Sequence, residues 1–301
     1  CALPISHGSN SVNFMKRQSQ FQLSPRSLAS AIGVSESSMK RWIDQGQLPV
    51  HITSGGHRKI SFSDAIKFIR THKRTIVDPS ALGLEGSEDA HSGIGQGQLV
   101  DILKTGDSAH LSNSLLQLYL SGYSMPSIFD ALLPEFRLIG ELGSDDSRYI
   151  STEHLYSTTF AKALSQLQLY LPAVDNMPIA IGGTLAPDPS YISSLLAETV
   201  ISSTGMRTMN LGGNTPITSI LETVEEFDAK LVWVSVVHQS DMYAINVALE
   251  NLYNTLQEKG VRCVIGGPAL QNPSTSHSFL EKHNASLHEV HQLASSIVSS
   301  N

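Results

Sequence analysis

Residues 23–70, LSPRSLASAIGVSESSMKRWIDQGQLPVHITSGGHRKISFSDAIKFIR, hold the pattern that decides the fold of the N-terminal part of the chain. Two short segments with apolar residues at helical spacing flank a turn that contains Gly33. The first segment is Pro25–Ala31, and the second follows Ser35, a residue type that favours a helix N-cap. The pattern predicts two helices joined by a tight turn.

The second of these helices has an apolar face and a polar face. Met39, Trp42 and Ile43 recur at helical spacing, so we expect them to be buried. The outward face is expected to carry Ser37, Ser38, Lys40 and Arg41. Hydroxyl and cationic side chains on one helix face suit the phosphates and base edges of a DNA major groove. The helix is therefore a candidate DNA-recognition helix.

A β-hairpin is predicted after this helix. Gly55 and Gly56 lie between two short strand-like runs within residues 52–60. We expect the tip of the hairpin to carry His57, Arg58 and Lys59. Such a tip would contact the DNA backbone or the minor groove.

Positive charge is concentrated in the same region. Residues 15–74 contain 11 Lys and Arg against three Asp and Glu, a net charge of +8, whereas the rest of the chain has nine against 24, a net charge of −15. A basic module in an acidic chain indicates a local anion-binding surface. A solvated basic face on a small helical domain is the alternative, but turn, helix, hairpin and charge coincide here.

The stretch SLASAIGVSESSMKRWIDQGQLP followed by TSGGHRKI resembles the winged helix-turn-helix of MerR and excisionase-type regulators. The resemblance lies within residues 21–74. It implies that the second helix reads the major groove and that the hairpin, or wing, contacts the DNA backbone. The DNA-binding residues implied are Ser37, Ser38, Lys40, Arg41, His57, Arg58 and Lys59.

A chain of 301 residues is long for one domain. We expect a multidomain α and α/β protein. Residues 1–20 are predicted to be a disordered tail, 21–74 the winged helix-turn-helix, 75–96 a flexible linker, 97–172 a four-helix bundle, and 173–301 a Rossmann-like domain. The linker prediction rests on its Gly, Ser, Asp and Glu content and on its lack of periodicity.

The bundle and the Rossmann-like domain are predicted from periodicity. The bundle region has two helical patterns around Gly106, one after Ser124 and one ending near Leu171. From Met177 onward, apolar strands alternate with helices. Strands are expected at 179–183, 206–213, 230–237 and 261–267, and helices at 191–205, 217–227, 242–260 and 286–300. This alternation predicts a doubly wound parallel sheet with a ligand crevice at the carboxyl ends of its strands.

Residues 97–297 resemble the cobalamin (B12)-binding module of methionine synthase and of light-responsive, cobalamin-dependent MerR-type repressors. The resemblance rests on IGELGSDDSRYISTEHL at 139–155, on DPSYIS and LGGNTP after the first two strands, on Ser235, and on Gly266-Gly267. It implies cobalamin as cofactor. The cofactor-binding residues implied are Glu153, His154, Asp188, Ser190, Gly212, Gly213, Ser235, Gly266 and Gly267. The small residues at strand ends would admit the nucleotide tail.

The chain departs from that family at its metal ligand. The family's cobalt-coordinating motif D-x-H-x-x-G reads Asp188-Pro189-Ser190-Tyr191-Ile192-Ser193 here, so serine replaces histidine. Serine is a poor cobalt ligand, and Asp188 has no imidazole to orient. Gly143 and Ser144 stand where the repressors have an upper-face Trp and His. We therefore assign no metal ligand, although His238 is an alternative donor.

The favoured expectation is a cytoplasmic, non-enzymatic DNA-binding transcriptional regulator with a cobalamin-module relative for sensing or oligomerisation. Its expected partners are double-stranded operator DNA, its own copies in a dimer or tetramer, and a protein antirepressor. The alternatives are a functional adenosylcobalamin-dependent light-sensing repressor and a corrinoid methyltransferase component. Two cysteines, Cys1 and Cys263, provide neither a disulfide framework nor a cysteine zinc site, and no apolar run could span a membrane.

Overall fold

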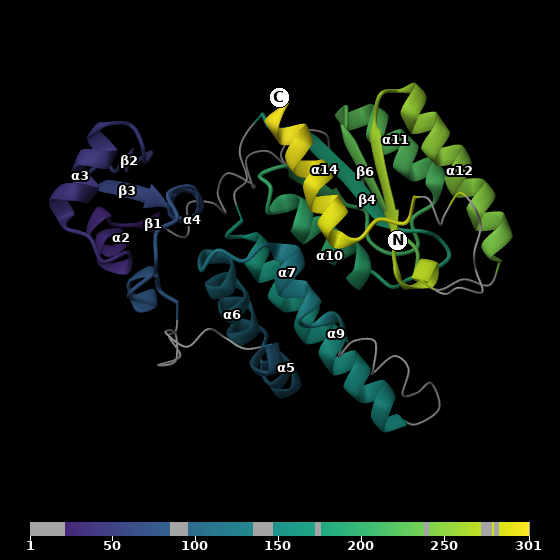
Figure 1. The fold of residues 1–301 in the computed structure, drawn as a ribbon, viewed down its shortest axis with the longest axis horizontal. Helices are drawn as coiled ribbons and strands as arrows, with labels where there is room; N and C mark the ends of the chain where they lie inside the picture. The colour runs from purple at the N-terminus through teal and green to yellow at the C-terminus, as the bar shows by residue number, and fades with distance from the viewer. Residues whose placement is uncertain are drawn as a thin grey trace. The chain divides into compact units, whose positions relative to one another are not determined.

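The computed structural model describes residues 22–84, 96–134, 147–171, 176–237, 241–271, 279 and 283–300. The chain forms two compact units, each with its own internal contacts (Figure 1). The first unit comprises Cys1–Ile94 and Asn113–Tyr123, and the second comprises Gly95–Ser112 and Ser124–Asn301. Within the described residues, no helix is both long and apolar enough to cross a membrane.

The first unit begins with the two predicted helices, α2 (Pro25–Ala31) and α3 (Glu36–Asp44). Each follows a serine, Ser24 or Ser35, whose hydroxyl accepts an N–H from the first helical turn. Gly33 lies between the helices with φ +67°, a left-handed conformation that glycine adopts without strain. The helix bounds thus follow directly from the caps and the turn.

A small antiparallel sheet and a further helix complete the core of this unit. The strands are β1 (Gln22–Leu23), β2 (His51–Ile52) and β3 (Arg58–Ser61), in the order β1-β3-β2, and helix α4 (Phe62–Thr71) follows. Fully buried side chains come from every helix and from β3, among them Leu28, Met39, Ile60 and Ile66. The sheet and the three helices therefore share one hydrophobic core.

Trp42 is less buried than predicted. It is half-buried, whereas Met39 and Ile43 on the same helix are buried. Its ring lies 5.4 Å from that of Phe68, and the Arg74 guanidinium lies 4.6 Å above it. The indole is thus covered by a cation–π contact at the edge of the core.

The first part of the predicted linker is structured. The backbone N–H groups of Val77 and Asp78 donate to the Ala31 carbonyl, and the 3-10 helix η1 (Pro79–Leu82) packs on α2. Hydrogen bonds from Ser80 and Ser30 hold the pKa of Asp78 below its ordinary value. Residues 77–84 therefore pack on α2, with Leu82 and Leu84 buried and Val77 48% exposed, whereas residues 85–95 of the predicted linker lie outside the described residues.

Leu82 is expected to contribute substantially to the stability of the first unit. Its side chain is only 5% exposed, so Leu82→Ala should leave a cavity and lower the free energy of unfolding by about 2–4 kcal/mol. Urea unfolding followed by Trp42 fluorescence, in a Trp233→Phe background, measures this. The exposed Thr75→Ala is the control, and equal stability of the two variants would show that 75–84 is not part of the core.

Within the described residues 96–134 and 147–171, four helices follow in the predicted order. They are α5 (Gln96–Thr105), α6 (Ser108–Leu120), α7 (Met125–Asp130) and α9 (Ser147–Gln168). The part of α6 from Asn113 onward belongs to the first unit. Gly106 has φ +77° between the first two, and the Asp107 carboxylate accepts two N–H groups from the start of α6. Within the second unit, α5 packs on α9.

The rest of the second unit is a four-stranded parallel sheet in the order β5-β4-β6-β7. The strands are β4 (Ile179–Thr184), β5 (Arg207–Asn210), β6 (Leu231–Ser235) and β7 (Arg262–Gly266). The helices are α10 (Ile192–Ser202), α11 (Ile217–Phe227), α12 (Met242–Glu258) and α14 (Leu287–Ser299). Their sequence positions match the predicted alternation.

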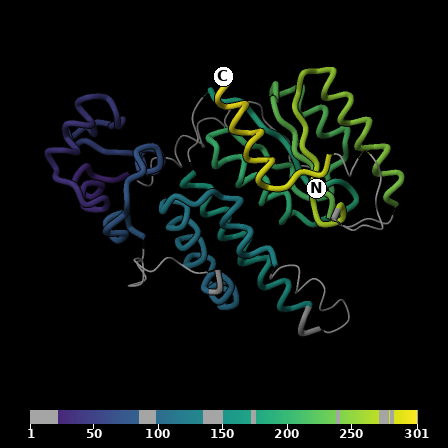
Figure 2. The backbone as a smooth tube through the Cα atoms, in the orientation of Figure 1, coloured from purple at the N-terminus to yellow at the C-terminus, as the bar shows by residue number. Residues whose placement is uncertain are grey.

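Helices cover both faces of this sheet (Figures 1 and 2). Val232 and Val234 of β6 join the core formed with α11 and α12. Trp233, between them, points to the other face, where its Nε1 donates to Ser194 Oγ of α10, 2.9 Å away, and α10 packs against α14. The predicted doubly wound parallel sheet is therefore confirmed.

Candidate functional site

The outward face of α3 carries the predicted cations. Ser37, Lys40 and Arg41 are exposed, and in the part of the chain that is described neither cation is paired with a carboxylate. Ser38 is only half-buried, and its backbone N–H and hydroxyl both lie within hydrogen-bond distance of Ser35 Oγ, at 3.2 and 3.0 Å. Ser38 thus belongs mainly to the N-cap, whereas Lys40 and Arg41 are free to meet an anion.

The hairpin has a different tip from the one predicted. Its turn runs from Thr53 to His57, and the Thr53 N–H donates to the His57 carbonyl at 2.9 Å. Arg58 and Lys59 lie in β3 rather than at the tip, and Lys59 is half-buried. The placement of these two residues was wrong because the turn closes at His57, one residue before the ladder resumes.

Arg58 already has an intramolecular partner. Its Nη1 donates to Asp44 Oδ1 at 2.8 Å, and both side chains are about half exposed. Asp44 is the last residue of α3. The pair therefore connects the hairpin to the end of the candidate recognition helix.

In the second unit, the predicted cofactor residues Asp188 and Ser190 lie in the loop between β4 and α10. Asp188 is 5% exposed, its Oδ1 accepts the Ser190 N–H at 2.8 Å, and its carbonyl accepts the Asn214 N–H at 2.6 Å. Asp188 thus holds its own loop and the neighbouring β5–α11 loop together. Thr184, at the end of β4, is fully buried, and among the described residues its hydroxyl has no hydrogen-bond partner.

The glycines at the strand ends are close to the chain's own backbone. A Cβ atom would lie 2.2 Å from the Pro189 carbonyl oxygen at Gly213, 2.8 Å from that of Ala285 at Gly266, and 2.3 Å from that of Val236 at Gly267. Only Gly212, with φ +84°, has open space beside it. Packing of the loops is therefore sufficient reason for glycine at three of these positions.

Ser235 ends β6 and is buried, 4% exposed. Its carbonyl accepts the Leu185 N–H at 2.9 Å, and it pairs with Thr184 on one side and Gly266 on the other. Ser235 therefore lies in the centre of the sheet's carboxyl edge, beside Thr184.

Glu153 and His154 lie together on α9. The His154 imidazole is 73% exposed and its Nε2 lies 3.6 Å from Glu153 Oε2, while the Ser157 hydroxyl donates to Glu153 Oε1 at 2.8 Å. Three positions from the sequence analysis lie outside the described residues: Gly143 and Ser144, which stand where the repressors have Trp and His, and His238, the alternative cobalt ligand. In the described parts of the chain, no group of three or more His, Cys, Asp or Glu side chains could hold a metal ion. Burial raises the pKa of the Cys263 thiol to about 12, so this thiol stays protonated at neutral pH.

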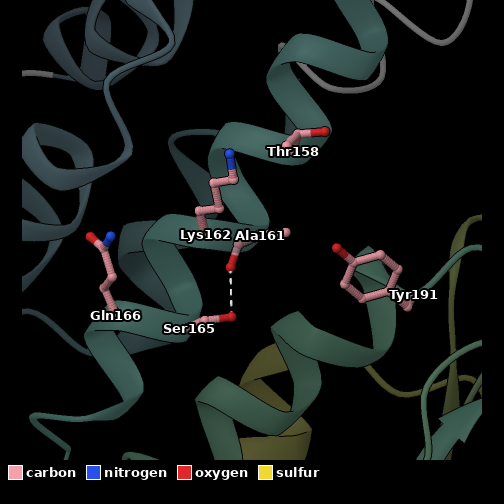
Figure 3. Close-up of a pocket in the computed structure, with 6 residues that line it drawn as sticks. All are labelled: Thr158, Ala161, Lys162, Ser165, Gln166 and Tyr191. Carbon is pink, nitrogen blue, oxygen red and sulfur yellow. Dashed lines mark hydrogen bonds between the residues drawn. The ribbon is translucent and has the colours of Figure 1, made fainter.

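A surface pocket of about 370 Å³ lies between α9 and the start of α10. It is lined by Thr158, Ala161, Lys162, Ser165, Gln166 and Tyr191, and Figure 3 shows the Tyr191 ring across an opening from the helix. Gln168 of α9 donates to Thr199 of α10 at 3.0 Å and so connects the two walls. None of these lining residues was predicted, although Thr158, Lys162 and Ser165 recur at helical spacing.

No family model matches this chain, and neither does any curated protein. Several solved structures do resemble it. A monomethylamine corrinoid protein of Methanosarcina barkeri has a TM-score of 0.48 and 17% identity, covering 66% of this chain and 96% of that one. A cobalamin-binding protein of Desulfitobacterium hafniense has a TM-score of 0.40 and 14% identity, covering 74% and 100%.

A third similar structure is the methanol:cobalamin methyltransferase complex of M. barkeri, with a TM-score of 0.35 and 12% identity, covering 77% of this chain and 88% of that one. All three are cobalamin or corrinoid proteins by description, but the superpositions are loose. The parallel-sheet fold of the second unit is therefore established by its own strand order and helix placement, not by these similarities.

Proposed function

We propose that the first unit is a winged helix-turn-helix that binds duplex DNA, and that the chain is a transcriptional regulator. The observation that carries this proposal is the exposed Lys40 and Arg41 on α3, which pair with no carboxylate among the described residues, next to a hairpin joined to the end of the same helix. An α-helix of this size fits the major groove, where arginine and lysine read guanine or neutralise phosphates. The net charge of +8 over residues 15–74 would attract the polyanion.

Individual contacts follow from these positions. Lys40 and Arg41 would meet base edges or phosphates in the groove, with Ser37 beside them and Ser38 holding the helix N-terminus. His57 would approach DNA from the hairpin tip. The proposal also includes operator DNA as the target, a homodimer or tetramer, a protein antirepressor, a cytoplasmic location and the absence of enzymatic activity.

The second unit is proposed to be the sensing or oligomerisation module of this regulator. The similar solved structures include cobalamin-binding proteins, which is why cobalamin remains the first ligand to try. The residues present do not fit a cobalt coordinated by histidine from the β4–α10 loop. Position 190 is serine where the cobalamin-binding modules have histidine, and Asp188 accepts the Ser190 N–H instead of orienting an imidazole. Cobalamin bound here would therefore be held without a nitrogen ligand from this loop.

Selection from a random duplex pool tests the DNA-binding proposal. The full chain is incubated with the pool at low salt, and bound duplexes are recovered and sequenced over successive rounds. Enrichment of a sequence motif is expected if α3 contacts base edges. A pool that stays unselected, with no retained DNA, would contradict the proposal.

The cobalt ligand is tested by electron paramagnetic resonance of cob(II)alamin added to the protein. Uniform ¹⁵N labelling of the wild-type protein is expected to leave the nitrogen splitting of the cobalt signal unchanged, because position 190 offers no imidazole. The Ser190→His variant is the matched comparison, and there the label should alter the splitting. A label-dependent splitting in the wild type would show that another histidine coordinates cobalt.

A further inference from the structure

The contact between Arg58 and Asp44 is the one described ion pair that joins the hairpin to α3. Arg58 Nη1 lies 2.8 Å from Asp44 Oδ1, with the two side chains 41% and 48% exposed. Fourteen positions separate the two residues in sequence, so the pair is a tertiary contact and not a feature of the turn itself. It fixes where one strand of the hairpin stands relative to the helix.

Both strands of the hairpin are held through this contact. Arg58 is the register partner of Ile52 across the β2–β3 ladder, and Lys59 is the partner of His51. Ile52 is 71% exposed, so little packing anchors β2. The ladder and the ion pair together therefore set the direction in which the tip residue His57 is presented.

The charge of Asp44 needs an explanation in a DNA-binding surface. A carboxylate at the end of a recognition helix repels phosphates unless a cation neutralises it. Glu36, at the other end of α3, is the comparable residue: it lies 3.3 Å from Arg26 of α2, and both side chains are well exposed. Of these two ion pairs of α3, that of Asp44 joins the helix to the hairpin and that of Glu36 joins it to α2.

We propose that Asp44 is a positioning residue that sets the hairpin for sequence-specific DNA binding through its ion pair with Arg58. This inference rests on the proposed DNA-binding function and deepens it. It also assigns to Arg58 a role in orienting the hairpin rather than that of a simple phosphate contact. A half-exposed ion pair contributes little to folding stability, so its effect belongs to the geometry of the bound state.

The test compares Asp44→Asn with Glu36→Gln in the full chain. Each substitution removes one negative charge from α3, so electrostatics alone would tighten binding to any duplex by a similar factor in both variants. The dissociation constant is measured by fluorescence anisotropy for a duplex selected by the wild-type protein and for a shuffled duplex of the same composition. The readout is the ratio of the two constants.

Asp44→Asn is expected to bind the shuffled duplex at least as tightly as the wild type but to lose about two- to fivefold in discrimination between the two duplexes. Glu36→Gln should keep the wild-type discrimination. Asp44→Glu, which can still reach Arg58, should restore most of it. In a double-mutant cycle, Asp44→Asn and Arg58→Gln should be non-additive, whereas Glu36→Gln and Arg58→Gln should be additive.

Equal discrimination in Asp44→Asn and Glu36→Gln would overturn the proposal, because it would leave only the charge effect. So would additive behaviour of Asp44→Asn and Arg58→Gln, which would make Arg58 an independent DNA contact. Failure of the wild-type protein to bind either duplex is a different result: it contradicts the proposed function itself. Thermal unfolding of each variant checks that the first unit remains folded.

Discussion

Replacing Lys40 and Arg41 together with alanine is expected to weaken binding of the full chain to a selected duplex by at least about 30-fold. Both side chains are exposed on α3, and each contact to a base edge or phosphate contributes roughly 1–3 kcal/mol. Lost phosphate contacts should also make the affinity less dependent on salt. Fluorescence anisotropy at several KCl concentrations measures both effects.

The matched control for this variant is Lys230→Ala with Lys259→Ala. It removes the same charge from the second unit, where the two lysines pair with Asp228 and Glu225 at 2.6 and 2.7 Å. Its DNA affinity should stay within about twofold of wild type, since the lysines lie away from α3 in sequence and in a different unit. A comparable loss in both variants would mean that only total charge matters and that α3 is not the recognition helix.

Gly182→Ala is expected to abolish the native packing of the parallel sheet. Gly182 lies in the middle of β4, and a Cβ there would be 2.1 Å from the Trp233 carbonyl oxygen and 2.2 Å from its ring carbon Cδ2. Neither group can move, because both belong to the fully buried centre of β6. The expected cost exceeds about 3 kcal/mol, and near-ultraviolet circular dichroism and Trp233 fluorescence in a Trp42→Phe background report it.

Gly260→Ala is the control for the sheet prediction. Gly260 has φ +70° and open space around its Cα, so alanine there should cost only about 1 kcal/mol of backbone strain. A Gly182→Ala protein that unfolds like Gly260→Ala would show that β4 and β6 are not packed as described. Both variants lie in the second unit, which keeps the comparison within one cooperative structure.

The sequence predicted most elements because their signals are local. Ser35 caps α3 as predicted, and the alternation of apolar strands with helices led to the parallel sheet. The bounds of α11, Ile217–Phe227, match the prediction because Pro216 precedes the helix and Asp228, in a left-handed conformation, ends it. Such features need only neighbouring residues.

Features that depend on contacts between distant residues were not predicted. Residues 75–96 were predicted to be a linker because of their Gly, Ser, Asp and Glu content, yet Leu82 and Leu84 within them are buried and η1 packs on α2. Arg58 looked like a free wing cation, and its pairing with Asp44 has no sequence signature. The glycines at the strand ends suggested room for a ligand, although at Gly213 and Gly267 the nearest atoms are backbone carbonyls. Periodicity and composition cannot distinguish these cases.

The most direct test of the central proposal is the salt dependence of wild-type binding to the selected duplex. Dissociation constants are measured for the full chain from low to physiological salt, with the shuffled duplex as competitor. The proposal predicts binding that weakens linearly on a log–log plot as salt rises, with the selected duplex preferred throughout. Absence of binding to either duplex at low salt, or binding without any preference between them, would contradict it.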